Sequence, residues 1–195
     1  MNVFDFDGTI YDGDSTVDFF LYMIKSQPKI LVCLPTQFFG FFRYSLRKIS
    51  KTELKETFFS FLKEIDDVEL AVANFWDINE HKIKRWYKDI QQVDDVIISA
   101  SPRFLLEEIC RRLGIKTLIA SEVNQKTGEY SGVNCHGKEK LRRYVELFPE
   151  TTYDQFYSDS KSDLALAKIA KEAFYVKKDH ILSWEDLLEN DGKNE

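Results

Sequence analysis

The alternation of short apolar runs with amphipathic stretches, which begins near residue 93, constrains the fold of this chain more than any other feature. We expect strands at 95–99, 116–120, 154–158 and 173–176, and helices at 101–113, 137–147 and 162–170. Strands that alternate with helices in this way form a parallel sheet with helices on both faces. The sequence therefore predicts a Rossmann-like, doubly wound α/β fold.

One more strand stands alone at the N-terminus, at residues 2–6, and a helical block separates it from the other strands. Within this block, apolar residues recur at helical spacing over 15–24, 29–46, 50–65 and 67–90. We therefore expect a core domain made of residues 1–13 and 92–195. The helical segment 14–91 is expected to form a cap that is inserted after strand one.

Composition narrows the class of protein. The chain has 195 residues, of which 44% are hydrophobic, and a formal net charge of -6. The hydrophobic share suffices for a packed core, and the charge lacks the basic excess of nucleic-acid-binding domains. The three cysteines are far apart and form no C-x-x-C pair, which argues against a disulfide framework or a structural zinc site. With no signal peptide before the first strand, we expect a cytoplasmic protein that binds no nucleic acid.

Two aspartates stand where the N-terminal strand ends, in the sequence Asp5-Phe6-Asp7-Gly8-Thr9. Side chains at i and i+2 of a strand point the same way, so Asp5 and Asp7 should share one face. They would lie at the carboxyl edge of the sheet, where open α/β folds bind ligands. Two carboxylates this close repel each other unless a cation or a proton joins them. A D-G turn is the ordinary alternative, but a turn does not need two aspartates after an apolar strand.

Further candidates for chemistry stand at later element ends: Ser99, the pair Lys138 and Lys140, and the pair Asp159 and Asp163. Each has an ordinary explanation when taken alone, because serine and aspartate cap helices and lysines are commonly solvated. By the same reasoning Ser101 is expected to be an N-cap, with Pro102 at the first helical position. Ser99 is less well explained by capping, and a hydroxyl at a strand end would suit a phosphate.

The order of these motifs resembles the four-motif pattern of the haloacid dehalogenase (HAD) superfamily over essentially the full length of the chain. The pattern is D-x-D-G-T after strand one, a serine at a strand end, a lysine at a helix start and D-x-x-x-D at another strand end. The stretches FDFDGTIYDGDST, VIISASP, TGEYSG and CHGKEK resemble the phosphoserine-phosphatase-like branch, subfamily IB. The resemblance implies an HAD core with a helical-bundle cap after strand one, and a phosphoric monoester hydrolase.

The resemblance also implies a role for each acidic motif. Asp5 would be the nucleophile that forms an aspartyl-phosphate, and Asp7 the general acid and base. Mg²⁺ would bind to the Asp5 carboxylate, the Asp7 backbone carbonyl and the Asp159 carboxylate. Asp163 would contact the metal ligands or the lysine and hold them in position.

The same resemblance implies a phosphate-binding set, in which Ser99, Ala100 and Lys140 hold the phosphoryl oxygens. Lys138 is the fallback for the lysine, because both residues lie near the start of one predicted helix. Asp14 occupies the position of the glutamate that binds the substrate amine in phosphoserine phosphatases, and it is one methylene shorter. Ala100 and Ser101 replace the two glycines that typically follow the serine there, so phosphoserine is only one alternative.

The apolar segment 30–42 points to a second alternative for the substrate. Its 13 residues are too few to span a bilayer, which takes about 20. Basic residues follow it at 43, 47, 48 and 51, a pattern that suits docking on an anionic membrane surface. A phosphatidylglycerophosphatase-like enzyme that acts on a lipid phosphate is therefore the leading specific alternative. We favour a bundle core for the nine phenylalanines between residues 19 and 61, since aromatic side chains usually fill cores.

Other functions remain open for the same fold. A phosphotransferase would share the aspartyl-phosphate and differ only in the acceptor. A catalytically silent binding protein is also possible in principle, but the complete set of motifs argues against it. The expected partners are a small phosphorylated metabolite or a lipid phosphate. The sequence leaves the oligomeric state open.

Overall fold

The structure is a computed structural model, and it describes residues 1–149 and 152–186. The strands are β1 (Asn2–Phe4), β2 (Val96–Pro102), β3 (Thr117–Ser121), β4 (Tyr153–Ser158), β5 (Ala170–Lys177) and β6 (His180–Ser183). The α-helices are α1 (Ser15–Ser26), α2 (Leu34–Ser45), α3 (Lys51–Phe59), α4 (Val68–Asn79), α5 (Arg85–Ile90), α6 (Arg103–Leu113), α7 (Lys138–Leu147) and α8 (Leu164–Ala167). Short 3₁₀ helices are η1 (Pro28–Cys33), η2 (Ser60–Glu64), η3 (Glu80–Lys82) and η4 (Lys161–Asp163).

The strands form one sheet in the order β3-β2-β1-β4-β5-β6. Strands β1 to β5 are parallel, and β6 pairs antiparallel with β5 at one edge. This order confirms the predicted Rossmann-like parallel sheet. Strand β1 lies between β2 and β4, so the carboxyl ends of the three strands that carry the aspartate and serine motifs meet at the centre of one edge.

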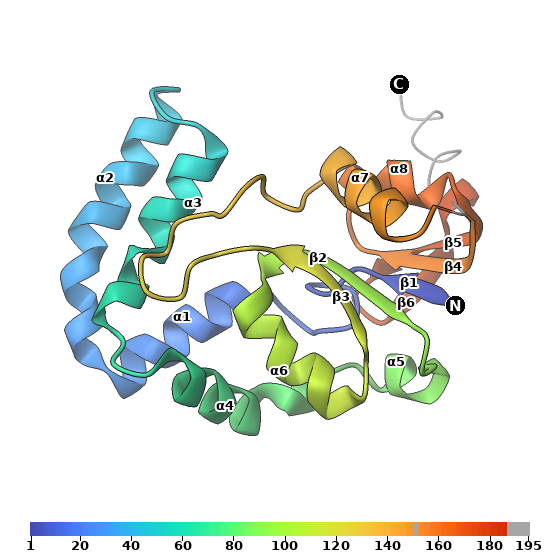
Figure 1. The fold of residues 1–195 in the computed structure, drawn as a ribbon, viewed down its shortest axis with the longest axis horizontal. Coiled ribbons are helices and arrows are strands. Elements are labelled where there is room, and N and C mark those ends of the chain that lie inside the picture. Colours follow the sequence, from blue (N-terminus) through green and yellow to red (C-terminus); the bar gives the residue numbers. More distant parts are fainter. Residues whose placement is uncertain (150–151, 187–195) are drawn as a thin grey trace.

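The sheet separates two hydrophobic layers, because successive strand side chains point to opposite faces. Val3 packs with Tyr144 of α7 on one face, where α8 also lies. Phe4 points to the other face, into the cluster that contains Trp76 of α4 and Leu105 of α6. The Trp76 indole N–H donates to the Leu105 carbonyl at 2.7 Å and ties these two helices together. Figure 1 shows α7 and α8 on one side of the sheet and α4, α5 and α6 on the other.

The helical segment after β1 shares this second layer. Phe19, Phe61 and Phe75 belong to the same buried cluster as Phe4, so the helices and the sheet have one continuous core on this face. The hairpin of α2 and α3 extends from that core at one end of the molecule (Figure 1). Helix α3 begins at the capping box of Ser50 and Glu53.

The expectation that the phenylalanines of this segment fill a core is right for some of them and wrong for others. Four are buried: Phe19, Phe20, Phe59 and Phe61. Four on α2 are exposed: Phe38, Phe39, Phe41 and Phe42. The reason is that α2 packs on α3 along one side only, with Gly40 as its single buried residue. No helix of the described residues is long and apolar enough to cross a membrane.

The predicted capping role of Ser101 is wrong. Strand β2 continues to Pro102, and α6 begins only at Arg103, without a side-chain cap. The Ser101 hydroxyl donates to the Asp7 carboxylate instead. A local capping pattern was therefore overridden by a contact between residues that are far apart in the sequence.

Elements near the C-terminal end also differ from the prediction. The helix expected at 162–170 is replaced by η4 and the short α8, because the chain from Ala170 forms strand β5, which lies between β4 and β6. The antiparallel β6 was not predicted. The sequence from Asn190 onward is polar, which predicts a frayed tail, but these residues lie outside the described part of the chain.

Candidate active site

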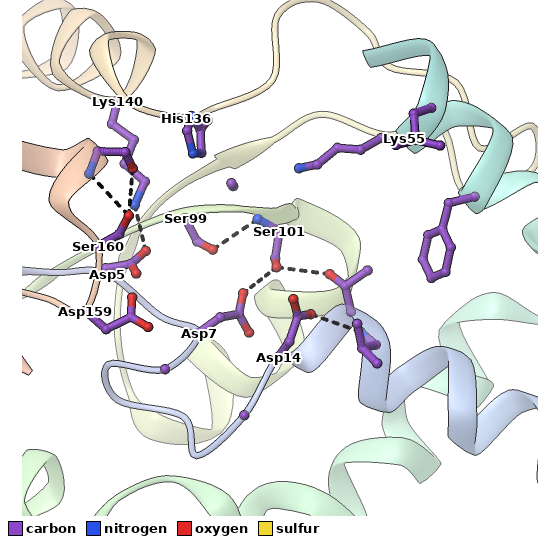
Figure 2. A pocket seen from close by; sticks show the side chains of 18 of the residues that line it. Asp5, Asp7, Asp14, Lys55, Ser99, Ser101, His136, Lys140, Asp159 and Ser160 are labelled. Atoms are coloured by element: carbon purple, nitrogen blue, oxygen red, sulfur yellow. Dashed lines mark hydrogen bonds and ion pairs between the residues drawn. The ribbon is translucent and has the colours of Figure 1, made fainter. Parts of the chain in front are cut away.

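A cavity of about 780 Å³ opens at the carboxyl ends of β1, β2 and β4. Its floor is polar, and Figure 2 shows the carboxylates and serines of the sheet edge pointing into it. The predicted residues that line it are Asp5, Asp7, Asp14, Ser99, Ala100, Lys140, Asp159 and Asp163. The opposite wall comes from the helical segment, through Gln37, Phe41, Leu54, Lys55, Phe58 and Phe59. The tertiary structure thus brings the dispersed motifs to one place.

Asp5 lies at the centre of the floor, just beyond β1. Its backbone N–H donates to the Tyr157 carbonyl of β4 at 2.9 Å, which holds the residue in line with the sheet. Its Oδ1 accepts from Lys140 Nζ at 2.7 Å, and its Oδ2 accepts from the Thr9 hydroxyl at 3.4 Å. The same Thr9 oxygen accepts the Asp159 backbone N–H at 2.9 Å. Thr9 therefore connects the first and the fourth motif.

Lys140 is buried at the start of α7 and pairs with two carboxylates. Its Nζ lies 2.7 Å from both Asp5 Oδ1 and Asp163 Oδ2. Burial works against its charge, but the two carboxylates outweigh burial and raise the pKa of Lys140. Lys138, two residues earlier, is exposed. The geometry thus separates two lysines that the sequence left as alternatives, and it favours Lys140.

Asp163 is buried behind Lys140 and does not cap the next helix. Its Oδ2 accepts from Lys140 and also from the Ser158 hydroxyl at 2.8 Å. The Ser158 hydroxyl in turn accepts the Ser160 backbone N–H at 3.1 Å. Ser158 replaces the glycine usual at this position of the family pattern, and its hydroxyl supports the carboxylate that orients Lys140.

Asp7 is held by hydrogen bonds to both of its carboxylate oxygens. Oδ1 accepts the Ser15 backbone N–H at 2.6 Å at the start of α1, and Oδ2 accepts the Ser101 hydroxyl. Burial, with a smaller contribution from the charge of Asp14, raises the pKa of Asp7 to about 6. A carboxyl group whose pKa approaches neutrality can both donate and accept a proton, as acid–base catalysis requires.

Ser99 and Ala100 lie in the middle of β2, just before Ser101, which binds this carboxylate. Ser99 is buried, and its hydroxyl accepts the Ser101 backbone N–H at 3.1 Å. The Ala100 carbonyl accepts the Ser121 hydroxyl at 3.0 Å, which joins β2 to β3 at this end. Both residues line the cavity within the same floor as Asp5.

The acidic residues fit a divalent cation. Asp159 lies over Gly8: a Cβ at Gly8, whose φ is +71°, would be 2.0 Å from Asp159 Oδ2. Burial, and then the charge of Asp5, raise the pKa of Asp159 to about 7. Two carboxylates this close repel each other unless a cation or a proton joins them. No group of three or more His, Cys, Asp or Glu side chains forms a metal site within residues 1–149 and 152–186. Mg²⁺, however, binds through few protein groups and keeps several waters.

The wall opposite the floor contains residues that could contact the rest of a substrate. Asp14 is the N-cap of α1, where its Oδ1 accepts the Val17 N–H at 3.0 Å, and it also lines the cavity. Lys55 extends from α3 toward the floor (Figure 2). It donates to Asn134 Oδ1 at 2.9 Å, and burial lowers its pKa to about 8.

Sequence reasoning missed three residues of this site. Thr9 and Ser101 stand inside the motifs themselves, so their positions were a usable signal. Lys55 had no such signal, because a lysine on an amphipathic helix is normally solvated. Only the packing of α3 over the sheet edge brings it to the cavity.

Comparisons with known proteins identify the family of the chain. The family model of haloacid dehalogenase-like hydrolases matches residues 3–168. Histidinol-phosphatase from Neisseria meningitidis serogroup C is 25% identical, with 91% of this chain and 90% of that protein covered. Protein CicA from Caulobacter vibrioides is 34% identical over 86 residues, and the match spans 41% of this chain but only 39% of CicA.

Solved structures show the same fold. A protein of unknown function from Bordetella pertussis Tohama I superposes with a TM-score of 0.69 at 20% identity, covering 89% of this chain and 87% of that one. A probable phosphoserine phosphatase from Vibrio cholerae has a TM-score of 0.58 at 13% identity, covering 88% of this chain and 55% of that one.

Proposed function

The chain belongs to the haloacid dehalogenase-like hydrolase family, and from this premise we propose that it is a phosphatase. We propose that it hydrolyses a phosphate monoester through an aspartyl-phosphate on Asp5, with Mg²⁺ as cofactor. The observation that carries the proposal is the pairing of buried Asp5 with Lys140 at 2.7 Å, on the floor of a cavity that Asp7 and Asp159 also line.

The first chemical step is attack by the Asp5 carboxylate on phosphorus, in line with the leaving alcohol. Asp7 gives its proton to the leaving oxygen as the ester bond breaks. Lys140, Ser99 and the Ala100 backbone would hold the phosphoryl oxygens while charge shifts between them, which is the main task in phosphoryl transfer.

The second step returns the enzyme to its starting state. Asp7, now a carboxylate, takes a proton from a water molecule, and that water attacks the phosphorus of the aspartyl-phosphate. Inorganic phosphate leaves and the Asp5 carboxylate is regenerated. The Asp5 and Asp159 carboxylates and the Asp7 backbone carbonyl would hold Mg²⁺. The cation would offset the repulsion between Asp5 and an anionic phosphate.

The substrate we propose is a small phosphorylated metabolite. Histidinol phosphate and phosphoserine are the first compounds to test, because a similar protein and a structural neighbour act on such esters by their names. Lys55 on the cavity wall would suit a second anionic group of the substrate, and Asp14 an amine.

The proposal is tested by phosphate release from a panel of phosphate monoesters. The panel contains histidinol phosphate, phosphoserine, sugar phosphates, nucleotides and lipid phosphates. We expect turnover with Mg²⁺, its loss with EDTA, and its return when Mg²⁺ is added in excess. Turnover that is unchanged by EDTA would contradict the role of the metal. Transfer of phosphate to an added alcohol, without release of inorganic phosphate, would indicate a phosphotransferase.

Ser101→Ala tests the role of Asp7 as acid and base. Loss of the hydroxyl removes one of the two hydrogen bonds that orient the Asp7 carboxylate. We expect kcat to fall by roughly ten- to a hundredfold with little change in KM, since a mispositioned acid weakens the chemical step. The pH profile of kcat should shift as well. Ser162→Ala, at another serine that lines the cavity, is the control, and an equal effect there would argue against a specific role for Ser101.

A further inference from the structure

Helix α2 carries an apolar face that no described part of the chain covers. This face consists of Leu34, Phe38, Phe41 and Phe42, which recur at i, i+4, i+7 and i+8 as on one side of a helix. Phe38 is 77% exposed and Phe41 63%. Phe39, 60% exposed, widens it. Contiguous exposed aromatic side chains of this kind usually mark an interaction surface.

The opposite side of α2 explains why these side chains point outward. A Cβ at Gly40 would lie 2.5 Å from Thr57 Cγ2, so α2 can approach α3 closely only through this glycine. The Gln37 side chain donates to the Phe58 carbonyl at 2.8 Å on the same side. Figure 1 shows α2 at the outer edge of the molecule, with α3 between α2 and the sheet. The packing therefore leaves the phenylalanines without a partner.

Four cations follow this face directly: Arg43, Arg47, Lys48 and Lys51. Within residues 1–149 and 152–186 no salt bridge within 4 Å involves any of them, whereas Arg112 and Arg142 each pair with carboxylates. Residues 28–52 contain no Asp or Glu, in a chain whose net charge is -6. The end of the apolar face is thus a local basic cluster without a close ion pair among the described residues; the Glu53 carboxylate interacts with the charge of Arg43 only at longer range.

We propose that α2 docks the protein on the surface of an anionic lipid bilayer. The phenylalanines would enter the boundary between headgroups and acyl chains, and the four cations would lie against lipid phosphates. Basic residues beside an apolar helix face match this surface in both charge and polarity. A second copy of the chain fits less well, because its own segment 28–52 offers no carboxylate to the cations.

The docked face is continuous with the active site. Phe41 of this face also lines the cavity that contains Asp5, as does Gln37 on the side of α2 that contacts α3. Docking would therefore bring the mouth of the cavity to the bilayer surface. In that position, a phosphate monoester carried by a lipid can reach Asp5. This step rests on the proposed phosphatase activity.

The test is co-sedimentation of the whole chain with vesicles of phosphatidylcholine alone and of phosphatidylcholine mixed with phosphatidylglycerol. We expect binding to the anionic vesicles to be roughly tenfold stronger or more, and to weaken as salt is added. Phe38→Ser with Phe39→Ser and Phe42→Ser should abolish binding, and so should Arg43→Glu with Arg47→Glu and Lys48→Glu. Leu70→Ser with Ile78→Ser, at exposed apolar residues of α4, is the matched control and should bind like the parent.

Several outcomes would overturn the docking proposal. These are absence of binding, equal binding to both vesicles, or a parent protein that dimerises through the phenylalanines without binding vesicles. Turnover of a soluble phosphate monoester is measured beside each binding assay and should be equal in all variants. Vesicle binding without turnover would contradict the proposed function but not the docking. Turnover without vesicle binding would contradict the docking but not the proposed function.

Discussion

Asp5→Asn is expected to reduce kcat by a factor on the order of 10³ or more, because an amide cannot replace a carboxylate as the nucleophile. The substitution keeps the shape of the side chain, and Lys140 retains its contact with Asp163 at 2.7 Å. The fold should therefore persist. Phosphate release with Mg²⁺ measures the loss, and circular dichroism verifies the fold.

A matched control lies on the same loop. Asp12→Asn makes the same chemical change at an exposed aspartate, and its turnover should stay close to that of the parent. Intact mass of the quenched parent enzyme should also show a phosphate adduct that Asp5→Asn lacks. If Asp5→Asn retained most of the parent's turnover, the nucleophile would have to be another residue and the proposed mechanism would fail.

Lys140→Met is expected to damage both stability and activity. The substitution leaves the Asp5 and Asp163 carboxylates buried without their common cation, and breaking a buried ion pair in this way costs about 3–5 kcal/mol of unfolding free energy. Turnover should fall by roughly a hundredfold or more, because a cation that holds the phosphoryl oxygens is lost. Urea unfolding and phosphate release measure the two effects.

Two further variants separate these effects. Lys138→Met makes the same change at the exposed lysine and should alter neither quantity much. Lys140→Met combined with Asp163→Asn removes one of the unpaired carboxylates, so it should recover part of the lost stability but none of the lost activity. Recovery of activity in the double variant would show that Lys140 has a structural role alone.

Much of the fold could be predicted from periodicity. The strand that ends before Asp5 and the strand that ends near Ser99 are short apolar runs, and such runs bounded by turn residues identify buried strands. Because parallel strands end at a common edge, the sequence also predicted that these residues would meet there. The order β2-β1-β4, which only the structure gives, places them side by side.

The errors arose where a local pattern competed with a distant contact. Ser101 and Pro102 match a helix start, yet the serine hydroxyl binds Asp7, which is 94 positions away in the sequence. The capping alternative for Asp163 fails for the same reason, because its carboxylate is buried against Lys140, the contact that the family resemblance implied. Local signals describe what a segment would do alone, and buried charges and hydroxyls follow their strongest available partner.

By itself, the sequence determined the type and order of most elements up to β4, since hydrophobic spacing and turn residues act within a few positions of one another. It also determined which residue types reach the edge of the sheet. Only the tertiary structure shows that Lys140 contacts the buried carboxylates whereas its fallback Lys138 is exposed to solvent. Likewise, only the tertiary structure shows that the α2 phenylalanines are exposed. Their exposure follows from the close contact of Gly40 with α3, which leaves the other side of α2 uncovered, and no local sequence pattern encodes that contact.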